Sequence, residues 1–295
     1  MNDIKAVVAA QEYIKAHHND NEFCLEIVCN AIGYSRRQLD RLFQKHLKTT
    51  LSEYINAVVL SASAEKLLDA DNSVIDIALE SHYQSHEGYT KSFAKRFSVT
   101  PKEYRKSQIA IPLYTQHPAN HYRILKEGQA MDTTTICTVT PVNRPKRKLI
   151  YLTSKSATDY LSYCEEVGCD WEGLLNSIHE KFDTAALIDL PDFLQENGIS
   201  KIAAGVEVPI DYEKPLPDGY SVAELPECVM LYFQSEPYDN PDYFGKYIGL
   251  VFKAIENYNL ERYGYRSATS IAPTLNLGAE PEIGARVAIP VECIK

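Results

Sequence analysis

Hydrophobic residues recur at helical spacing through the first hundred or so residues of the chain. The apolar positions within 25–32 lie on one face of a predicted helix, and Gly33 marks its end. Ser35, with Gln38 three residues later, forms a capping box that predicts the start of the next helix. Two helices joined by a short turn containing glycine predict a helix-turn-helix unit at about residues 25–46.

The second helix of this unit has one apolar and one polar face. Leu39, Leu42 and Phe43 form the apolar face, which we expect to be buried. A polar helix face entered through such a turn is a candidate reader of the DNA major groove. The residues of that face are Arg36, Arg37, Gln38, Arg41, Gln44 and Lys45.

A second helix-turn-helix unit is predicted over residues 73–97. Residues 51–68 carry an uninterrupted helical stripe, which predicts one long buried helix between the two units. Ser85 is placed to cap the second helix of the later unit, and Thr100-Pro101 begins a short closing helix. The residues that this second helix is expected to turn outward are His86, Glu87, Thr90, Lys91 and Lys95.

The pattern changes after the closing helix. Residues 107–132 contain proline, asparagine and glycine without a sustained period, and they predict a linker. Residues 133–295 alternate strands rich in Val, Ile, Thr and Tyr with helices. The succession strand, helix, strand, strand occurs twice. It predicts an α+β C-terminal domain with an internal pseudo-repeat, after an all-α N-terminal domain of residues 1–106.

Length and charge agree with two domains, because 295 residues are many for one hydrophobic core. Residues 1–106 hold 14 Lys/Arg and 14 Asp/Glu. Residues 107–295 hold 16 and 26, and so they carry the whole net charge of −10. Within the first domain, residues 35–48 and 91–106 form two local basic patches, which favour contact with phosphate.

Composition also narrows the class of protein. No apolar run approaches the roughly 18 residues of a membrane span, and the N-terminus lacks the continuous apolar stretch of a signal peptide. We therefore expect a cytoplasmic protein that does not contact a membrane. The seven cysteines include no CxxC pair, which favours reduced thiols over disulfides or a metal site, and no cofactor is expected.

The helical motifs resemble those of the AraC/XylS transcription regulators over residues 4–106. In the first unit the resemblance rests on Gly33-Tyr34-Ser35 with Leu39, Arg41, Leu42 and Phe43. In the second it rests on Ile75-x-Ile77-Ala78, Tyr83-x-Ser85, Tyr89-x-x-x-Phe93-x-x-x-Phe97 and Thr100-Pro101-x-x-Tyr104-Arg105. The resemblance implies double-stranded DNA as a partner, activation of transcription, and Arg37 and Arg41 as the base-reading residues.

The second unit departs from the family pattern at the turn and at the start of its reading helix. His82 stands where the family usually has glycine, and a positive φ there would cost about 1 kcal/mol. Glu87 is able to accept a hydrogen bond from cytosine N4, but it repels phosphate. Gly88 lowers helix propensity. We therefore expect the second unit mainly to anchor the DNA backbone while the first selects the sequence.

The order of strands and helices in residues 131–295 includes Gly-Tyr-x-Val at Gly219 to Val222 and ends with Ala-Ile-Pro-Val at 288–291. With these features the segment resembles a GyrI-like small-molecule-binding domain, and the whole chain resembles a Rob-type architecture. The resemblance implies an effector in a cleft between the two repeats, lined by aromatic residues. Arg286 stands where the family often has a glutamate, which favours an anionic or neutral effector over a cation. The ligand-binding candidates are Tyr151, Trp171, Tyr232, Phe233, Tyr243 and Arg286.

Two other functions stay open for the C-terminal domain. It could be a protein-interaction module, for example toward RNA polymerase, or a weak hydrolase of its ligand. Against an enzyme, the chain has no GxSxG, HExxH, GxGxxG or P-loop motif. Cys164, Cys169 and His179 share a helical region, but such residues are far more often structural than catalytic.

Overall fold

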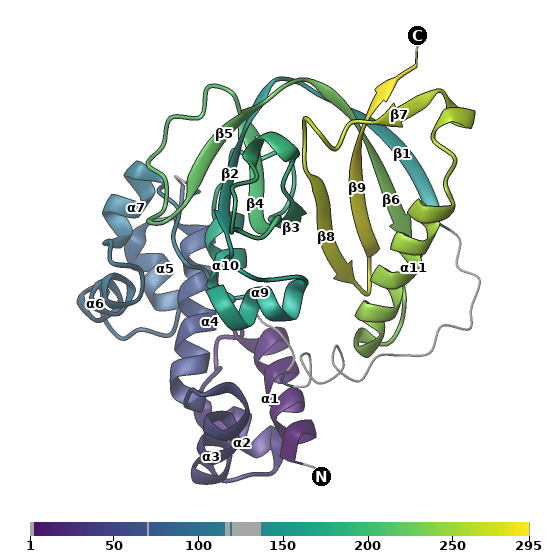
Figure 1. Ribbon diagram of the computed structural model, residues 1–295. Coiled ribbons are helices and arrows are strands. Elements are labelled where there is room, and N and C mark those ends of the chain that lie inside the picture. The colour runs from purple at the N-terminus through teal and green to yellow at the C-terminus, as the bar shows by residue number, and fades with distance from the viewer. Residues whose placement is uncertain (1–2, 70, 116–118, 120–136, 295) are drawn as a thin grey trace. The chain divides into compact units, whose positions relative to one another are not determined.

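The computed structural model describes residues 3–69, 71–115, 119 and 137–294 and divides the chain into two compact units (Figure 1). Unit 1 spans Met1–His121 and unit 2 spans Tyr122–Lys295. The helices of unit 1 are α1 Asp3–His17, α2 Leu25–Ile32, α3 Arg36–Leu47, α4 Leu51–Lys66, α5 Val74–Glu80, α6 His86–Phe97 and α7 Pro101–Ser107.

Both predicted helix-turn-helix units are present, as α2–α3 and α5–α6. Gly33 ends α2 in the left-handed conformation with φ 75°, and the capping box of Ser35 and Gln38 starts α3. The first core gathers α1 to α3 with the N-terminal half of α4, around Leu39 and Phe43. Local signals therefore set the bounds of each helix, and the apolar faces set their packing.

The second helix-turn-helix of unit 1, α5–α6, repeats this construction with serine and threonine caps. Ser73 and Ser85 each accept a hydrogen bond at the start of a helix, and a capping box at Thr100 starts α7. Tyr89 and Phe93 are fully buried in a core that also contains the C-terminal half of α4. Helix α4 thus belongs to both cores, and its 16 residues separate them along about 24 Å.

The predicted linker begins on the helical unit. Residues 109–113 pack against the second core, and the Tyr114 backbone N–H donates to Ser61 Oγ on α4 at 2.7 Å. Tyr114 also packs edge-to-face on Tyr54. Of the rest of the predicted linker, residues 116–118 and 120–132 lie outside the described residues.

Unit 2 is an antiparallel sheet with helices. Its strands are β1 Cys137–Arg144, β2 Arg147–Thr153, β3 Ala186–Asp189, β4 Ile202–Pro209, β5 Ser221–Leu225, β6 Cys228–Ser235, β7 Tyr265–Ser267, β8 Thr274–Glu280 and β9 Gly284–Cys293. Its helices are α9 Tyr160–Val167, α10 Asp170–Asn176 and α11 Phe244–Asn257, with single 3-10 turns at Asp192–Leu194, Pro241–Tyr243 and Glu261–Tyr263. The predicted helical region of Cys164, Cys169 and His179 is divided, because Gly168, with φ 95°, separates α9 from α10 and His179 follows the end of α10.

The strand order β1-β6-β9-β8-β3-β4-β2-β5 divides the sheet into two halves that meet where β3 pairs with β8. One half contains β2, β3 and β4 with α9 and α10, and the other contains β6, β8 and β9 with α11. In chain order the first half runs β2, α9, α10, β3, β4 and the second runs β6, α11, β7, β8, β9, so the second half has one more short strand than the predicted succession. Strand β1 precedes β2 but pairs with β6, and β5 precedes β6 but pairs with β2, so each half receives one strand from the other.

The two faces of this sheet are packed differently. On one face, Phe233 and Val287 share a core with Val251 of α11. The opposite face, which we call the inner face, carries one apolar core that spans both halves. The fully or nearly buried residues of this inner-face core are Leu149, Ala186, Ile188, Leu190, Ala203, Leu225, Met230, Leu275 and Ala288.

Candidate functional site

The polar face of α3 is exposed, and its side chains differ in how they are held. Arg36 lies 3.8 Å from Asp40, and Lys45 pairs with Asp3 at 2.9 Å. The Gln38 side chain accepts hydrogen bonds from Ser35 in the capping box.

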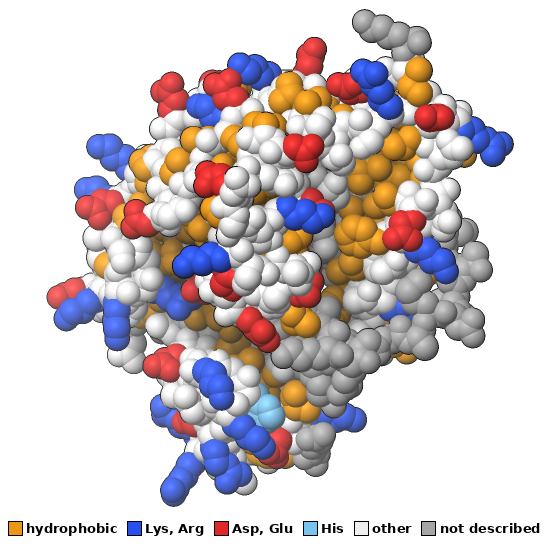
Figure 2. All heavy atoms as spheres, viewed as in Figure 1, with side chains coloured by type: hydrophobic (Ala, Val, Ile, Leu, Met, Phe, Trp, Pro, Cys, Tyr) orange, Lys and Arg blue, Asp and Glu red, His pale blue; other side chains and the backbone are white. Residues whose placement is uncertain are grey.

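Arg37, Arg41 and Gln44 are exposed on the same helix, and no hydrogen bond or ion pair engages them among the described residues. Figure 2 shows Lys and Arg side chains gathered where Figure 1 places α2 and α3. Arg37 and Arg41, one helical turn apart, are therefore the arginines of α3 that are free to bind a ligand.

Helix α6 exposes a smaller set. His86, Glu87, Lys91 and Lys95 are exposed, whereas Thr90 is half-buried and its hydroxyl oxygen is shielded from solvent. Ser85 Oγ accepts from the Gly88 N–H at 3.1 Å, so the first turn is capped despite the glycine. The start of α6 thus presents an imidazole and a carboxylate, with the lysines further along the helix.

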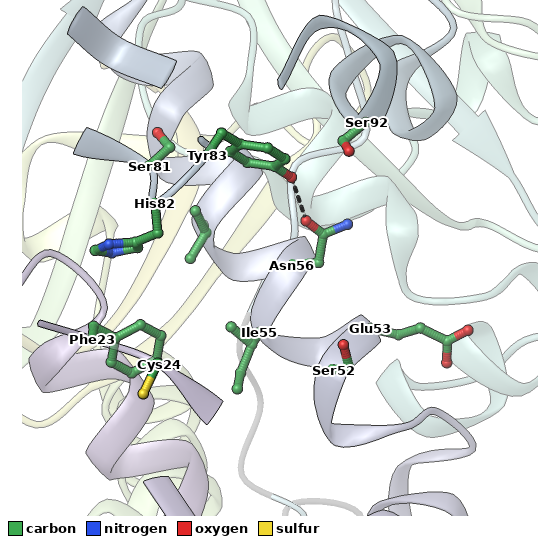
Figure 3. A pocket seen from close by; sticks show the side chains of 11 residues that line it. Phe23, Cys24, Ser52, Glu53, Ile55, Asn56, Ser81, His82, Tyr83 and Ser92 are labelled. Atoms are coloured by element: carbon green, nitrogen blue, oxygen red, sulfur yellow. Dashed lines mark hydrogen bonds between the residues drawn. The ribbon is translucent and has the colours of Figure 1, made fainter. Parts of the chain in front are cut away.

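A hollow of about 450 Å³ lies between the two helix-turn-helix units (Figure 3). It is lined by Phe23, Cys24, Ser52, Glu53, Ile55, Asn56, Val59, Ser81, His82, Tyr83 and Ser92. His82 has φ 63°, as its position in place of glycine predicts, and its Nε2 donates to the His18 carbonyl at 2.9 Å. Tyr83 donates from its hydroxyl to Asn56 Oδ1 at 2.6 Å. These two contacts connect the turn between α5 and α6 to α4 and to the end of α1.

The inner face of unit 2 brings together three of the six predicted ligand residues. Tyr232 lies opposite Ala288 in the register, and Arg286 is two residues away on the same strand. Tyr151 packs on the same apolar core as Tyr232, and both rings are partly exposed. Burial raises the pKa of the Tyr232 hydroxyl far above its usual range.

The other three candidates lie elsewhere. Phe233, the neighbour of Tyr232, points to the opposite face beneath α11. Trp171 is buried in α10 and packs edge-to-face on Tyr163, on the helix side of the other half. Tyr243 is exposed at the start of α11, with the Lys246 ammonium 5.5 Å from its ring centre.

The inner face also carries charged residues that are not among the six predicted ligand residues. Arg147 is fully buried and pairs with Glu207 at 2.7 Å, and it also donates to the Pro226 carbonyl. Burial alone would lower the pKa of Arg147, but the Glu207 carboxylate outweighs it and raises that pKa. Arg144 lies 3.4 Å from Glu207 and donates to the Tyr232 hydroxyl.

A third arginine extends this cluster toward solvent. Arg286 contacts Asp183 at 3.4 Å, and Arg144 lies 3.9 Å from the same carboxylate. Arg144 and Arg147 flank the turn between β1 and β2, where the chain passes from one half of the sheet to the other. We call Arg144, Arg147, Arg286, Glu207 and Asp183 the charged cluster. Its only sequence signal is the pair of arginines at that turn, because Glu207 and Asp183 come from distant segments.

Comparison with known proteins identifies the helical unit. Residues 28–107 match a family model described as a helix-turn-helix domain. Over 93 residues the chain is 33% identical to the transposon Tn10 TetD protein of Escherichia coli, which covers 32% of this chain and 67% of TetD. The chain belongs to the AraC/XylS family of transcription regulators. Its helical unit is a DNA-binding domain of that family.

Two further similarities each cover only part of the AraC/XylS protein. It is 37% identical over 90 residues to the transcriptional regulator Rob of Salmonella typhimurium, which covers 30% of this chain and 31% of Rob. The matched stretch is thus under a third of Rob. A structure of SAV2435 bound to tetraphenylphosphonium covers 52% of this chain at 12% identity and a TM-score of 0.34, a similarity too weak to support an assignment.

Two features are absent from the described residues. None of the helices there is long and apolar enough to cross a bilayer. No group of three or more His, Cys, Asp or Glu side chains is arranged there to hold a metal ion.

Proposed function

We propose that this AraC/XylS-family protein is a sequence-specific regulator that binds double-stranded DNA mainly through α3. The observation that carries this proposal is that Arg37 and Arg41 are exposed on one face of that helix and are unpaired within the part of the chain that the structure describes. An arginine that keeps both ends of its guanidinium free is able to bind guanine O6 and N7 together, which contributes about 1–3 kcal/mol of discrimination.

Helix α6 has a complementary role in this proposal. Lys91 and Lys95 are placed to contact phosphates, and His86 and Glu87 offer a limited base contact at the start of the helix. The two reading helices stand at the two ends of α4, about 24 Å long. This arrangement supports binding of one protein molecule to two successive major-groove segments on one face of the DNA. The contacts of His82 and Tyr83 hold the two helix-turn-helix motifs in a fixed relation to each other.

We also infer that unit 2 binds a small-molecule effector on its inner face. Partly exposed tyrosines above an apolar core, with charged groups at one end, have the composition of small-molecule sites. The resemblance to GyrI-like domains supports the same assignment. The resemblance to AraC/XylS regulators supports activation of transcription, and contact with RNA polymerase belongs to the alternative in which unit 2 is a protein-interaction module. In the space-filling view, hydrophobic side chains gather in the region of β8 and β9, between the two halves (Figure 2).

The DNA proposal is tested by selecting a preferred duplex from a random pool and measuring its affinity at fixed salt. Combining Arg37→Ala with Arg41→Ala should weaken binding to the selected duplex by about 100-fold or more, and binding to a random duplex only several-fold. Arg262→Ala, which removes an exposed arginine of unit 2, is the matched control. Equal losses on both duplexes would show that these arginines do not select bases.

A further inference from the structure

The charged end of the inner face divides into a tight part and a loose part. In the tight part, Arg147 and Glu207 form a contact of 2.7 Å with no exposed surface on the arginine. In the loose part, Arg144 and Arg286 both face Asp183, at 3.9 Å and 3.4 Å. Guanidinium–carboxylate hydrogen bonds normally measure about 2.7–2.9 Å, so Asp183 satisfies neither arginine fully.

The cluster also has unequal charges. Three guanidinium groups meet two carboxylates, Glu207 and Asp183, so one positive charge is in excess among these residues. The excess lies where the side chains become accessible, because Arg286 is 23% exposed and Asp183 is 18% exposed. A partly desolvated positive charge favours an anion as its next neighbour and disfavours a cation.

Aromatic rings adjoin the loose part. The Arg144 guanidinium lies 5.1 Å from the Phe182 ring centre and 5.6 Å from that of Tyr232. Tyr232 joins the charged end to the apolar core, which Tyr151 and Leu277 also contact. A ligand placed here would find an apolar surface for its body and guanidinium groups for its head.

We propose that the inner face of unit 2 binds an organic anion, an apolar ring or chain with a carboxylate-like head that Arg286 and Arg144 hold in place of Asp183. This inference rests on the proposed effector function and assigns the chemical class of the effector. Arg286 comes from β9 in one half of the sheet, and Asp183 precedes β3 in the other. Binding therefore exchanges an ion pair between the halves for two contacts to the ligand, which couples occupancy to the relation between the halves.

The test uses three probes that share one ring and differ in charge: 2-naphthoate, 2-naphthylmethanol and 2-naphthylmethylammonium. Their affinities for the full chain are measured by isothermal titration calorimetry. We expect naphthoate to bind at least about tenfold more tightly than the ammonium probe, with the alcohol between them. If the ammonium probe binds equally well or better, the anion assignment is overturned and the small-molecule function stands. If none of the three binds, both are overturned.

Two variants test the geometry. Arg286→Gln should remove the preference for naphthoate, whereas Arg266→Gln, which breaks an exposed pair with Glu292 at 2.7 Å, should leave it unchanged. Asp183→Asn should strengthen naphthoate binding several-fold, because the internal competitor is neutralised while its size is kept. Unchanged or weaker binding by Asp183→Asn would overturn the exchange. Trp171 fluorescence checks that each variant of unit 2 is folded.

Discussion

Replacing Glu207 by glutamine would remove the carboxylate that two arginines share inside unit 2. One Glu207 oxygen lies 2.7 Å from Arg147 Nη2, and the other lies 3.4 Å from Arg144 Nε. The Arg147 side chain is fully buried and that of Glu207 is 3% exposed, so water cannot replace the lost charge. Breaking such a pair typically costs about 3–5 kcal/mol, because a charge is left buried and unpaired. We expect about 3 kcal/mol, at the lower end of this range, since the glutamine oxygen keeps a partial negative charge beside the Arg147 guanidinium.

The assay is urea unfolding followed by tryptophan fluorescence. The chain has a single tryptophan, Trp171, and it lies in unit 2, so the signal reports this unit. Arg147→Met alone leaves Glu207 with Arg144 and should cost less than Glu207→Gln. The variant that combines Glu207→Gln with Arg147→Met should then be about 1–3 kcal/mol more stable than the sum of the two separate losses predicts.

The control is an exposed ion pair in the same unit. Lys201 and Asp189 lie 3.1 Å apart with side chains 60% and 45% exposed. Lys201→Met should therefore change the free energy of unfolding by less than about 1 kcal/mol. If Glu207→Gln changes it no more than this control, the buried pair does not stabilise unit 2 and the reasoning is wrong.

Three further predictions have defined outcomes. Lys91→Ala should lower the slope of log affinity for DNA against log salt by about one, measured by filter binding, and an unchanged slope would rule out its phosphate contact. Gly284 has φ 91°, and an added Cβ would meet two backbone oxygens, so Gly284→Ala should cost about 3 kcal/mol of unfolding free energy in urea. Gly198→Ala, at a residue with φ 84° and open space around it, should cost about 1 kcal/mol of unfolding free energy. A larger loss for Gly198→Ala than for Gly284→Ala would contradict this prediction. Hydrogen bonds from the Thr100 side chain and backbone N–H lower the pKa of Glu103, so its stabilising contribution is complete above the ordinary value of 4.5 and is lost as pH falls through the lowered folded value. Glu103→Gln should accordingly reduce the fall in the melting temperature of the helical unit as the pH is lowered, with melting followed by circular dichroism at each pH.

The helical unit could be predicted from the sequence because its determinants are local. A capping box spans four residues, and the stop at Gly33 and the left-handed turn at His82 are single-residue features. The polar face of α3 follows from the period of the helix. The capping role of Gln38 is also local, but which basic residues of that face are already paired is not. Lys45 pairs with Asp3 from another helix, so only the structure separates it from Arg37 and Arg41.

Unit 2 was predictable in its succession of elements but not in its site, because strand pairing there is long-range. Tyr232 and Phe233 are neighbours of similar character, yet alternation sends one to the inner face and the other beneath α11, so one of two adjacent candidates had to be misplaced. The charged cluster was missed for the same reason. Arg147 and Glu207 are brought together by the pairing of β2 with β4, and no local pattern marks two such residues as partners.

The position of the cluster gives a physical reason for its composition. Strands β1 and β2 belong to different halves of the sheet, and the exposed turn between them, Pro145-Lys146, is flanked by the buried Arg144 and Arg147. An arginine there can satisfy carbonyls on both sides, as Arg147 does with Pro226, but only if a carboxylate compensates its charge. Glu207 compensates one arginine closely and the second only in part, and Asp183 is left to two arginines that it does not fully satisfy. Because the two carboxylates compensate the three arginines only in part, an accessible positive charge remains beside Tyr232, where an anionic effector would bind.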